Sequence, residues 1–83
     1  MRVHIRYFAS LREAVGTGHE SLETSATTLA QLRESLAARG GAYAELRASG
    51  KVVRVALNQT LRDESATLTD GCEVAFFPPV TGG

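Results

Sequence analysis

The chain has 83 residues, 43% of them hydrophobic and 22% charged, and its nine basic residues balance nine acidic ones. This length fits one small domain with a thin core, and the zero net charge argues against a nucleic-acid-binding surface. No run approaches the roughly 18 apolar residues that a membrane span needs, and the single cysteine, Cys72, cannot form an internal disulfide. We therefore expect one domain, residues 1–83, in the cytoplasm, with no nucleic-acid or membrane partner.

Alternating residues at the start of the chain predict a half-buried strand. Its inward positions are Val3, Ile5 and Tyr7. Phe8 falls on the side of the charged residues, which is unusual for an aromatic residue. We expect Ser10 to cap a short helix over Leu11–Val15, which Gly16 ends. A weaker strand, residues 19–24, should follow with Leu22 inward.

The main helix is predicted to begin at Thr28, because Thr28 and Gln31 have the spacing of a capping box. Its apolar stripe consists of Leu29, Leu32 and Leu36, which suits a helix that covers a sheet. Gly40-Gly41 is the expected stop. A further helical turn is expected within residues 42–47, with Tyr43 and Leu46 facing inward.

Three strands are predicted in the second half of the chain. The first, Lys51–Leu57, has few polar positions and should be central in the sheet. Asn58-Gln59 is a turn, and Thr60-Leu61 a brief return strand. After the turn at Asp70-Gly71 the last strand spans residues 72–77. Its core positions are Val74 and Phe76, whereas Glu73, Ala75 and Phe77 share the exposed face.

These elements predict an α+β fold, a sheet with one main helix packed on one face. The other face should carry Phe8, Phe77 and Leu61. Scattered surface hydrophobic residues are common, but a contiguous apolar patch on a small protein typically binds a partner. We interpret this face as a partner surface.

The end of the chain follows the last strand through Pro78-Pro79 and Val80-Thr81 to Gly82-Gly83. Proline ends sheet pairing and favours an extended path, and glycine can pass through a narrow channel. A diglycine alone is more often a frayed end. With the preceding residues, it suggests a flexible tail, residues 78–83, whose functional group is the terminal carboxylate of Gly83.

No side-chain set in the sequence is typical of catalysis or metal binding. His4, His19 and Cys72 lack metal-ligand spacing, and Cys72 is interpreted as structural. The adjacent Asp63 and Glu64 are read as a solvated loop rather than as an acid/base pair. We therefore expect no bound cofactor and no catalytic side chain.

The chain resembles the small subunit of molybdopterin synthase, a ubiquitin-like sulfur carrier of the β-grasp fold, over nearly its whole length. The matching segments are residues 7–16, residues 55–60 and residues 68–83, the last of which is the most specific. Cys72 stands where the family usually has an acidic residue.

The resemblance implies a function for each part of the C-terminus. An activating enzyme of the ubiquitin type adenylates Gly83 with ATP, and a sulfur donor protein converts the adenylate to a thiocarboxylate. The tail, including Gly82, then enters the large synthase subunit and gives sulfur to cyclic pyranopterin monophosphate. Two small and two large subunits form a heterotetramer, in which the small subunit donates sulfur without catalytic groups of its own. The resemblance assigns partner binding to Phe8, Leu61, Phe77, Pro78, Pro79, Val80 and Thr81.

Three alternatives share the fold or the diglycine. One is a sulfur carrier for thiamine, cysteine or thiolated tRNA. Another is a modifier that forms an isopeptide bond through Gly83, and the third is a binding domain whose diglycine is incidental. The Phe76–Thr81 approach to the tail favours molybdopterin synthesis.

Overall fold

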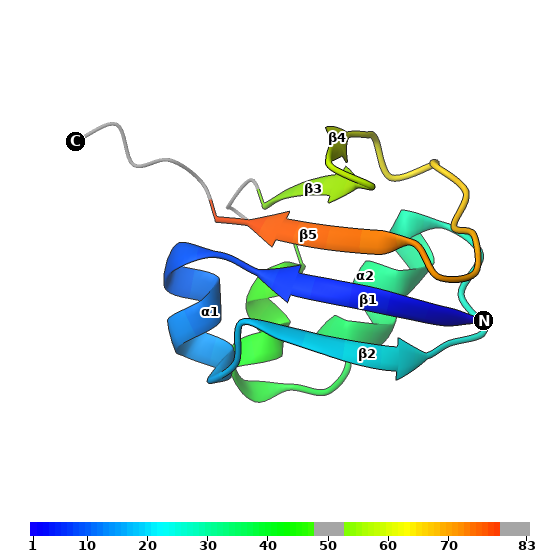
Figure 1. Ribbon diagram of the computed structural model, residues 1–83. Coiled ribbons are helices and arrows are strands. Elements are labelled where there is room, and N and C mark those ends of the chain that lie inside the picture. Colours follow the sequence, from blue (N-terminus) through cyan, green and yellow to red (C-terminus); the bar gives the residue numbers. More distant parts are fainter. Residues whose placement is uncertain (48–52, 79–83) are drawn as a thin grey trace.

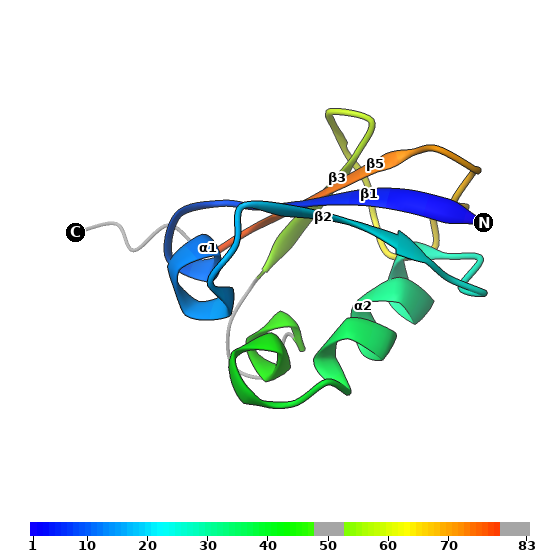
Figure 2. The same ribbon diagram turned by 60° about the horizontal axis from the view of Figure 1, so that its bottom comes forward.

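The computed structural model describes residues 1–47 and 53–78, and its strands form one mixed sheet in the order β2-β1-β5-β3-β4 (Figure 1). The strands are β1 (Arg2–Tyr7), β2 (His19–Glu23), β3 (Arg54–Leu57), β4 (Thr60–Leu61) and β5 (Glu73–Phe77). The helices are α1 (Ala9–Val15), α2 (Leu29–Ala37) and the 3₁₀ helix η1 (Gly41–Leu46). All three helices lie on one side of the sheet (Figure 2). We call the opposite side the open face.

The centre of the sheet is the parallel pair of β1 and β5, which joins the first and last strands of the described chain. Ile5 is the neighbour of Val74, and Tyr7 of Phe76. These four side chains are at most 1% exposed, so the predicted inward positions are confirmed. The sheet thus places the end of β5 beside the end of β1.

Strand β3 is not the central strand that the sequence predicted. It lies between β5 and β4, and β4 contains only two residues. The predicted segment has apolar residues on both faces. Val55 and Leu57 face the core, and Ala56 lies on the open face, where it is only 4% exposed. The strand begins at Arg54, and Lys51 lies outside the described residues.

Helix α2 covers the core side of the sheet with the predicted leucine stripe. Leu29, Leu32 and Leu36 are each at most 1% exposed. The Thr28 hydroxyl oxygen accepts a hydrogen bond from the Gln31 N–H at 3.2 Å, which confirms the predicted cap. In a capping box the Gln31 side chain would accept a hydrogen bond from the N–H of Thr28. Here it accepts from the N–H of the preceding residue, Thr27, at 2.7 Å.

The ends of the helices depart from the sequence prediction at two positions. Helix α1 begins at Ala9 with Phe8 as its N-cap, and no side chain makes a capping hydrogen bond, so the Ser10 cap was wrong. Gly16 ends α1 as predicted, with a φ of 87°. Helix α2 ends at Ala37, before the predicted glycine stop, and Gly41 begins η1 instead.

A polar cluster joins β2 to the helical side of the molecule. The Tyr7 hydroxyl donates to Glu20 at 3.3 Å, and Arg39 donates to the same carboxylate at 2.8 Å. Burial and the neighbouring Glu20 carboxylate raise the pKa of Tyr7, so its hydroxyl stays neutral at ordinary pH. The cluster fixes the edge of the sheet against the segment that follows α2.

A second polar contact ties α2 to the loop after β4. Arg33 is 8% exposed; it donates to the Val53 carbonyl at 2.7 Å and forms a salt bridge with Glu64. Asp63 and Glu64 are exposed, as predicted for a solvated loop, but Glu64 also has this structural partner. The ion pair links α2 to the loop after β4, a contact that the sequence pattern does not predict.

Candidate functional site

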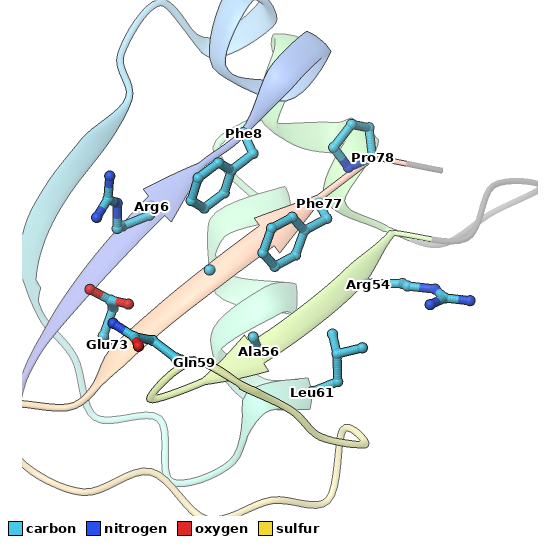
Figure 3. A pocket seen from close by; sticks show the side chains of 10 residues that line it. Arg6, Phe8, Arg54, Ala56, Gln59, Leu61, Glu73, Phe77 and Pro78 are labelled. Atoms are coloured by element: carbon cyan, nitrogen blue, oxygen red, sulfur yellow. The ribbon is translucent and has the colours of Figure 1, made fainter. Parts of the chain in front are cut away.

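The candidate site is a shallow hollow on the open face of the sheet, which no helix covers (Figure 3). Cross-strand pairing builds it, because partners in adjacent strands present their side chains on the same face. Arg6 is the neighbour of Ala75, Ala75 of Ala56, and Ala56 of Leu61, which gives one row across four strands. The hollow has a volume of about 850 Å³. Its lining residues are Arg6, Phe8, Arg54, Ala56, Gln59, Leu61, Glu73, Ala75, Phe77 and Pro78.

Two alanines explain why the surface is hollow. Ala56 and Ala75 are 4% and 5% exposed, although neither belongs to the core under α2. Their methyl groups are short, so the larger side chains around them stand higher. The result is an apolar floor surrounded by larger side chains, a shape that could receive a side chain of a partner.

An aromatic pair borders this floor. The rings of Phe8 and Phe77 stack with centroids 4.7 Å apart and an angle of 9° between their planes. The backbone sets this pairing, since the Phe8 N–H donates to the Phe76 carbonyl at 3.2 Å and so extends the β1–β5 contact by one residue. Both phenylalanines are half-buried, and their outer surfaces are available to a partner.

The third predicted apolar residue lies on the same face. Leu61 is 57% exposed, one of two exposed large hydrophobic residues in the described part of the chain. The structure therefore brings Phe8, Leu61 and Phe77 to one surface, as the sequence predicted. Their role in binding a partner stays a prediction.

The tail begins at the border of the hollow. Strand β5 delivers Phe77 and then Pro78, which is half-buried and lines the hollow. The remaining predicted site residues lie outside the described residues: Pro79, Val80, Thr81, Gly82 and Gly83. The described chain thus leaves the sheet directly beside the candidate docking surface.

The sequence placed Glu73 and Ala75 on the exposed face but did not predict that Arg6, Arg54, Ala56 and Gln59 line a site there. Arg54 and Ala56 alternate with core-facing Val55 and Leu57, a period-two signal that the apolar composition of the segment concealed. Phe8 was placed on the side of the charged residues of its strand, of which Arg6 is one, but no contact between the two was predicted. Its guanidinium carbon lies 5.4 Å from the centre of the Phe8 ring, within cation–π range.

The histidines and the cysteine that were considered as possible catalytic residues or metal ligands do not form one site in the structure. Cys72 is 3% exposed and packs in the core, which agrees with a structural role. The His4 ring nitrogen lies 2.8 Å from the Ser21 hydroxyl on the exposed side of β1. Across residues 1–47 and 53–78, no three His, Cys, Asp or Glu side chains gather as metal ligands would. Over the same ranges, no helix has both the length and the apolarity to span a bilayer.

A mixed five-stranded sheet with its main helix across one face defines a ubiquitin-like β-grasp protein. The chain belongs to the ThiS family, whose family model matches residues 5–83. It is 43% identical over 81 residues to the molybdopterin synthase sulfur carrier subunit of Escherichia coli (strain K12), covering 98% of this chain and 99% of that protein.

Solved structures agree with this assignment. The chain is similar to a chain in the complex of subunits 1 and 2 of the molybdopterin-converting factor from Helicobacter pylori, with 28% identity, a TM-score of 0.72 and complete coverage of both chains. It is also similar to small archaeal modifier protein 1 from Methanosarcina acetivorans, with 25% identity and a TM-score of 0.77 over 99% of this chain and 96% of that one. The expected β-grasp fold and the family resemblance are confirmed.

Proposed function

We propose that this chain is the sulfur carrier subunit of a molybdopterin synthase and that it carries sulfur as a thiocarboxylate on Gly83. The observation that carries the proposal is the continuity of the C-terminal segment. Strand β5 ends with Phe77 at the open-face hollow, where Pro78 follows it, five residues before Gly83 in the sequence. A partner that covers the hollow therefore receives the terminus nearby. The full-length similarity to curated carrier subunits supports the same function.

The chemistry proposed for Gly83 begins with activation. A free carboxyl terminus has a pKa of about 3.3–3.7, so at neutral pH it is an anion and a poor electrophile. A carboxylate oxygen attacks the α-phosphate of ATP and releases pyrophosphate. A persulfide of the donor protein then displaces AMP at the carbonyl carbon and forms an acyl disulfide, and a second thiol cleaves its S–S bond, which releases the acyl sulfur and leaves a disulfide. The product is a thiocarboxylate, whose sulfur is nucleophilic.

Transfer of this sulfur to cyclic pyranopterin monophosphate completes the proposed cycle. Each dithiolene needs two sulfur atoms, so two loaded carriers are used for each product. We expect the acid/base groups and the substrate contacts to belong to the large subunit. Hydrolysis at the carbonyl carbon returns Gly83 to a carboxylate, which can be activated again.

The proposed partners follow from this cycle. They are a large synthase subunit, a ubiquitin-activating-type enzyme and a sulfur donor protein. The similar Helicobacter pylori chain was solved in a complex of subunits 1 and 2, which supports a large-subunit partner here. We propose a heterotetramer of two small and two large subunits in the cytoplasm, with the open face docking in turn on the activating enzyme and the synthase.

A second candidate function is protein modification through Gly83. The similarity to a small archaeal modifier protein favours it. Both functions need an activated terminus, but they differ in the nucleophile, which is a sulfur donor in one and a lysine amine in the other. The mass of the product distinguishes them.

Variants of the tail test the proposed function directly. The intact chain, a Gly83 deletion, a one-residue extension and Gly82→Ala are each added to the activating enzyme, ATP, a sulfur source and the large subunit. We expect molybdopterin formation only from the intact chain, with Gly82→Ala impaired because an added methyl widens the tail. Thermal melts should agree across the series, since a terminal segment contributes little to stability. Full activity of the extended, unprocessed chain would contradict the proposal.

A further inference from the structure

Of the four arginines without an ion pair among the described residues, two line the open-face hollow and two, Arg12 and Arg62, lie elsewhere. Salt bridges in the described part of the chain engage four of the eight arginines, namely Arg2, Arg33, Arg39 and Arg47. Arg6 and Arg54 make no ion pair with any described residue, although both line the hollow. Figure 3 shows them at opposite sides of it. The aromatic pair therefore lies between two cations that have no carboxylate partner.

Arg54 lies on β3, beside the last residue of β5. It is the direct cross-strand neighbour of Phe77, and such neighbours have Cβ atoms about 5 Å apart on one face of a sheet. Figure 3 shows the Arg54 side chain extending outward from β3, so a partner that covers the Phe77 ring and continues across β3 also reaches its guanidinium. Removing a cation from water without an acceptor is unfavourable, so a well-fitting partner must supply one.

Arg6 has a different environment. Its guanidinium lies over Phe8, and Glu73, the one carboxylate among the described residues that line the hollow, is on the same side in Figure 3. Glu73 forms no salt bridge with Arg6, but it places a negative charge on the Arg6 side of the hollow. From strand spacing and rise, the Cα atoms of Arg6 and Arg54 are about 12 Å apart. Arg6 is the weaker of the two anchors.

We propose that the open-face hollow receives an acidic segment of the large synthase subunit, in which an apolar side chain rests on the Ala56–Ala75 floor and a neighbouring carboxylate binds Arg54. Arginine suits this contact because its planar group can bind both oxygens of a carboxylate. This inference rests on the proposed function, since the large subunit is the occupant. Arg54 is thereby a specificity determinant beside the apolar contact.

The test measures affinity of the full-length chain for the large subunit of the same organism at two salt concentrations. The variants are Arg54→Glu, Arg54→Gln and Arg54→Lys. Arg12→Glu is the matched control, because Arg12 is exposed on α1, makes no ion pair in the described part of the chain and does not line the hollow. It changes the net charge by the same amount as Arg54→Glu.

We expect Arg54→Glu to weaken binding about tenfold or more at about 0.02 M salt, mainly through slower association, and much less at about 0.5 M. Arg54→Gln should have a smaller effect, and Arg54→Lys should retain part of the affinity. Arg12→Glu should bind like the unmodified chain. Thermal melts check that each variant is folded. If Arg54→Glu does not fold, Arg54→Gln still tests the contact.

Three results would overturn the inference, and they have different meanings. If Arg54→Glu binds normally while Phe77→Glu does not, the docking face is correct and the acidic partner segment is wrong. If neither change affects binding, the open face is not the docking surface of the synthase. If Arg54→Glu changes only the self-association of the chain in analytical ultracentrifugation, the occupant is a second copy. The tail variants test sulfur transfer independently of all three.

Discussion

Phe8 and Phe77 stack at a centroid distance of 4.7 Å although they lie at opposite ends of the described chain. Phe8 joins β1 to α1, and Phe77 is the last residue of β5. The parallel pairing of β1 with β5 brings the two residues together on the open face. The first strand therefore fixes the orientation of the residue from which the tail departs.

Phe77→Glu should weaken binding to both the activating enzyme and the large subunit while the protein stays folded. The ring is half-buried, and the change removes a stacking contact that contributes about 0.5–1.5 kcal/mol in comparable pairs. An aromatic anchor at the centre of an interface commonly contributes about 2 kcal/mol or more to binding. Calorimetric titration with each partner, together with urea unfolding, measures the two effects separately.

Phe76→Ala is the matched change on the other side of the same strand and should have the opposite profile. Phe76 is completely buried and stacks on Tyr7 with centroids 6.1 Å apart. Loss of such a side chain costs about 3–5 kcal/mol of folding free energy, a large part of a small domain's stability. If Phe76→Ala unfolds no more readily than Phe77→Glu, our assignment of the two faces is wrong.

Thr28→Ala should lower the free energy of unfolding by about 1 kcal/mol, because it removes the hydroxyl that caps α2. Ser10→Ala provides the comparison, since Ser10 lies within α1 and makes no capping bond there. Its effect should stay within about 0.5 kcal/mol. Chemical unfolding of the two variants measures both values, and equal destabilisation would mean that Ser10 is a cap after all.

Glu64→Gln should destabilise the chain, because it leaves the Arg33 guanidinium buried without its ion-pair partner. Glu64 is about half exposed, so we expect a loss of about 1–2 kcal/mol rather than the larger value for a fully buried pair. Arg33→Met should lower the free energy of unfolding by no more than Glu64→Gln does, because it removes the cation together with its need for a partner. Urea unfolding of the two variants decides the order; a clearly larger loss for Arg33→Met would show that the bond to Val53 dominates.

Local sequence patterns predicted the features of the fold that depend on one segment. Alternation in β1 and β5 identified the buried positions, and the leucine stripe identified the buried side of α2. Gly71 has a positive φ, 80°, in the turn that Asp70-Gly71 predicted. These properties follow from periodicity and from backbone conformations that few residues accept.

Features that depend on pairing between distant segments were not predictable from the sequence. Strand β5 is the third of the five strands in the sheet order, between β1 and β3, and composition does not encode that order. The start of α1 is set by Phe8, whose backbone bonds to Phe76. Likewise, Arg54 joins Phe77 at the hollow only through the register of β3 and β5.

The mass of the C-terminal peptide tests the central claim, that Gly83 carries sulfur, most directly. The protein is purified from its own cells, digested and analysed by mass spectrometry. Our account predicts a fraction in which the terminal peptide gains about 16 Da, the mass difference between sulfur and oxygen. A terminal peptide found only unchanged in cells making the cofactor, or joined to lysine side chains of other proteins, would contradict it.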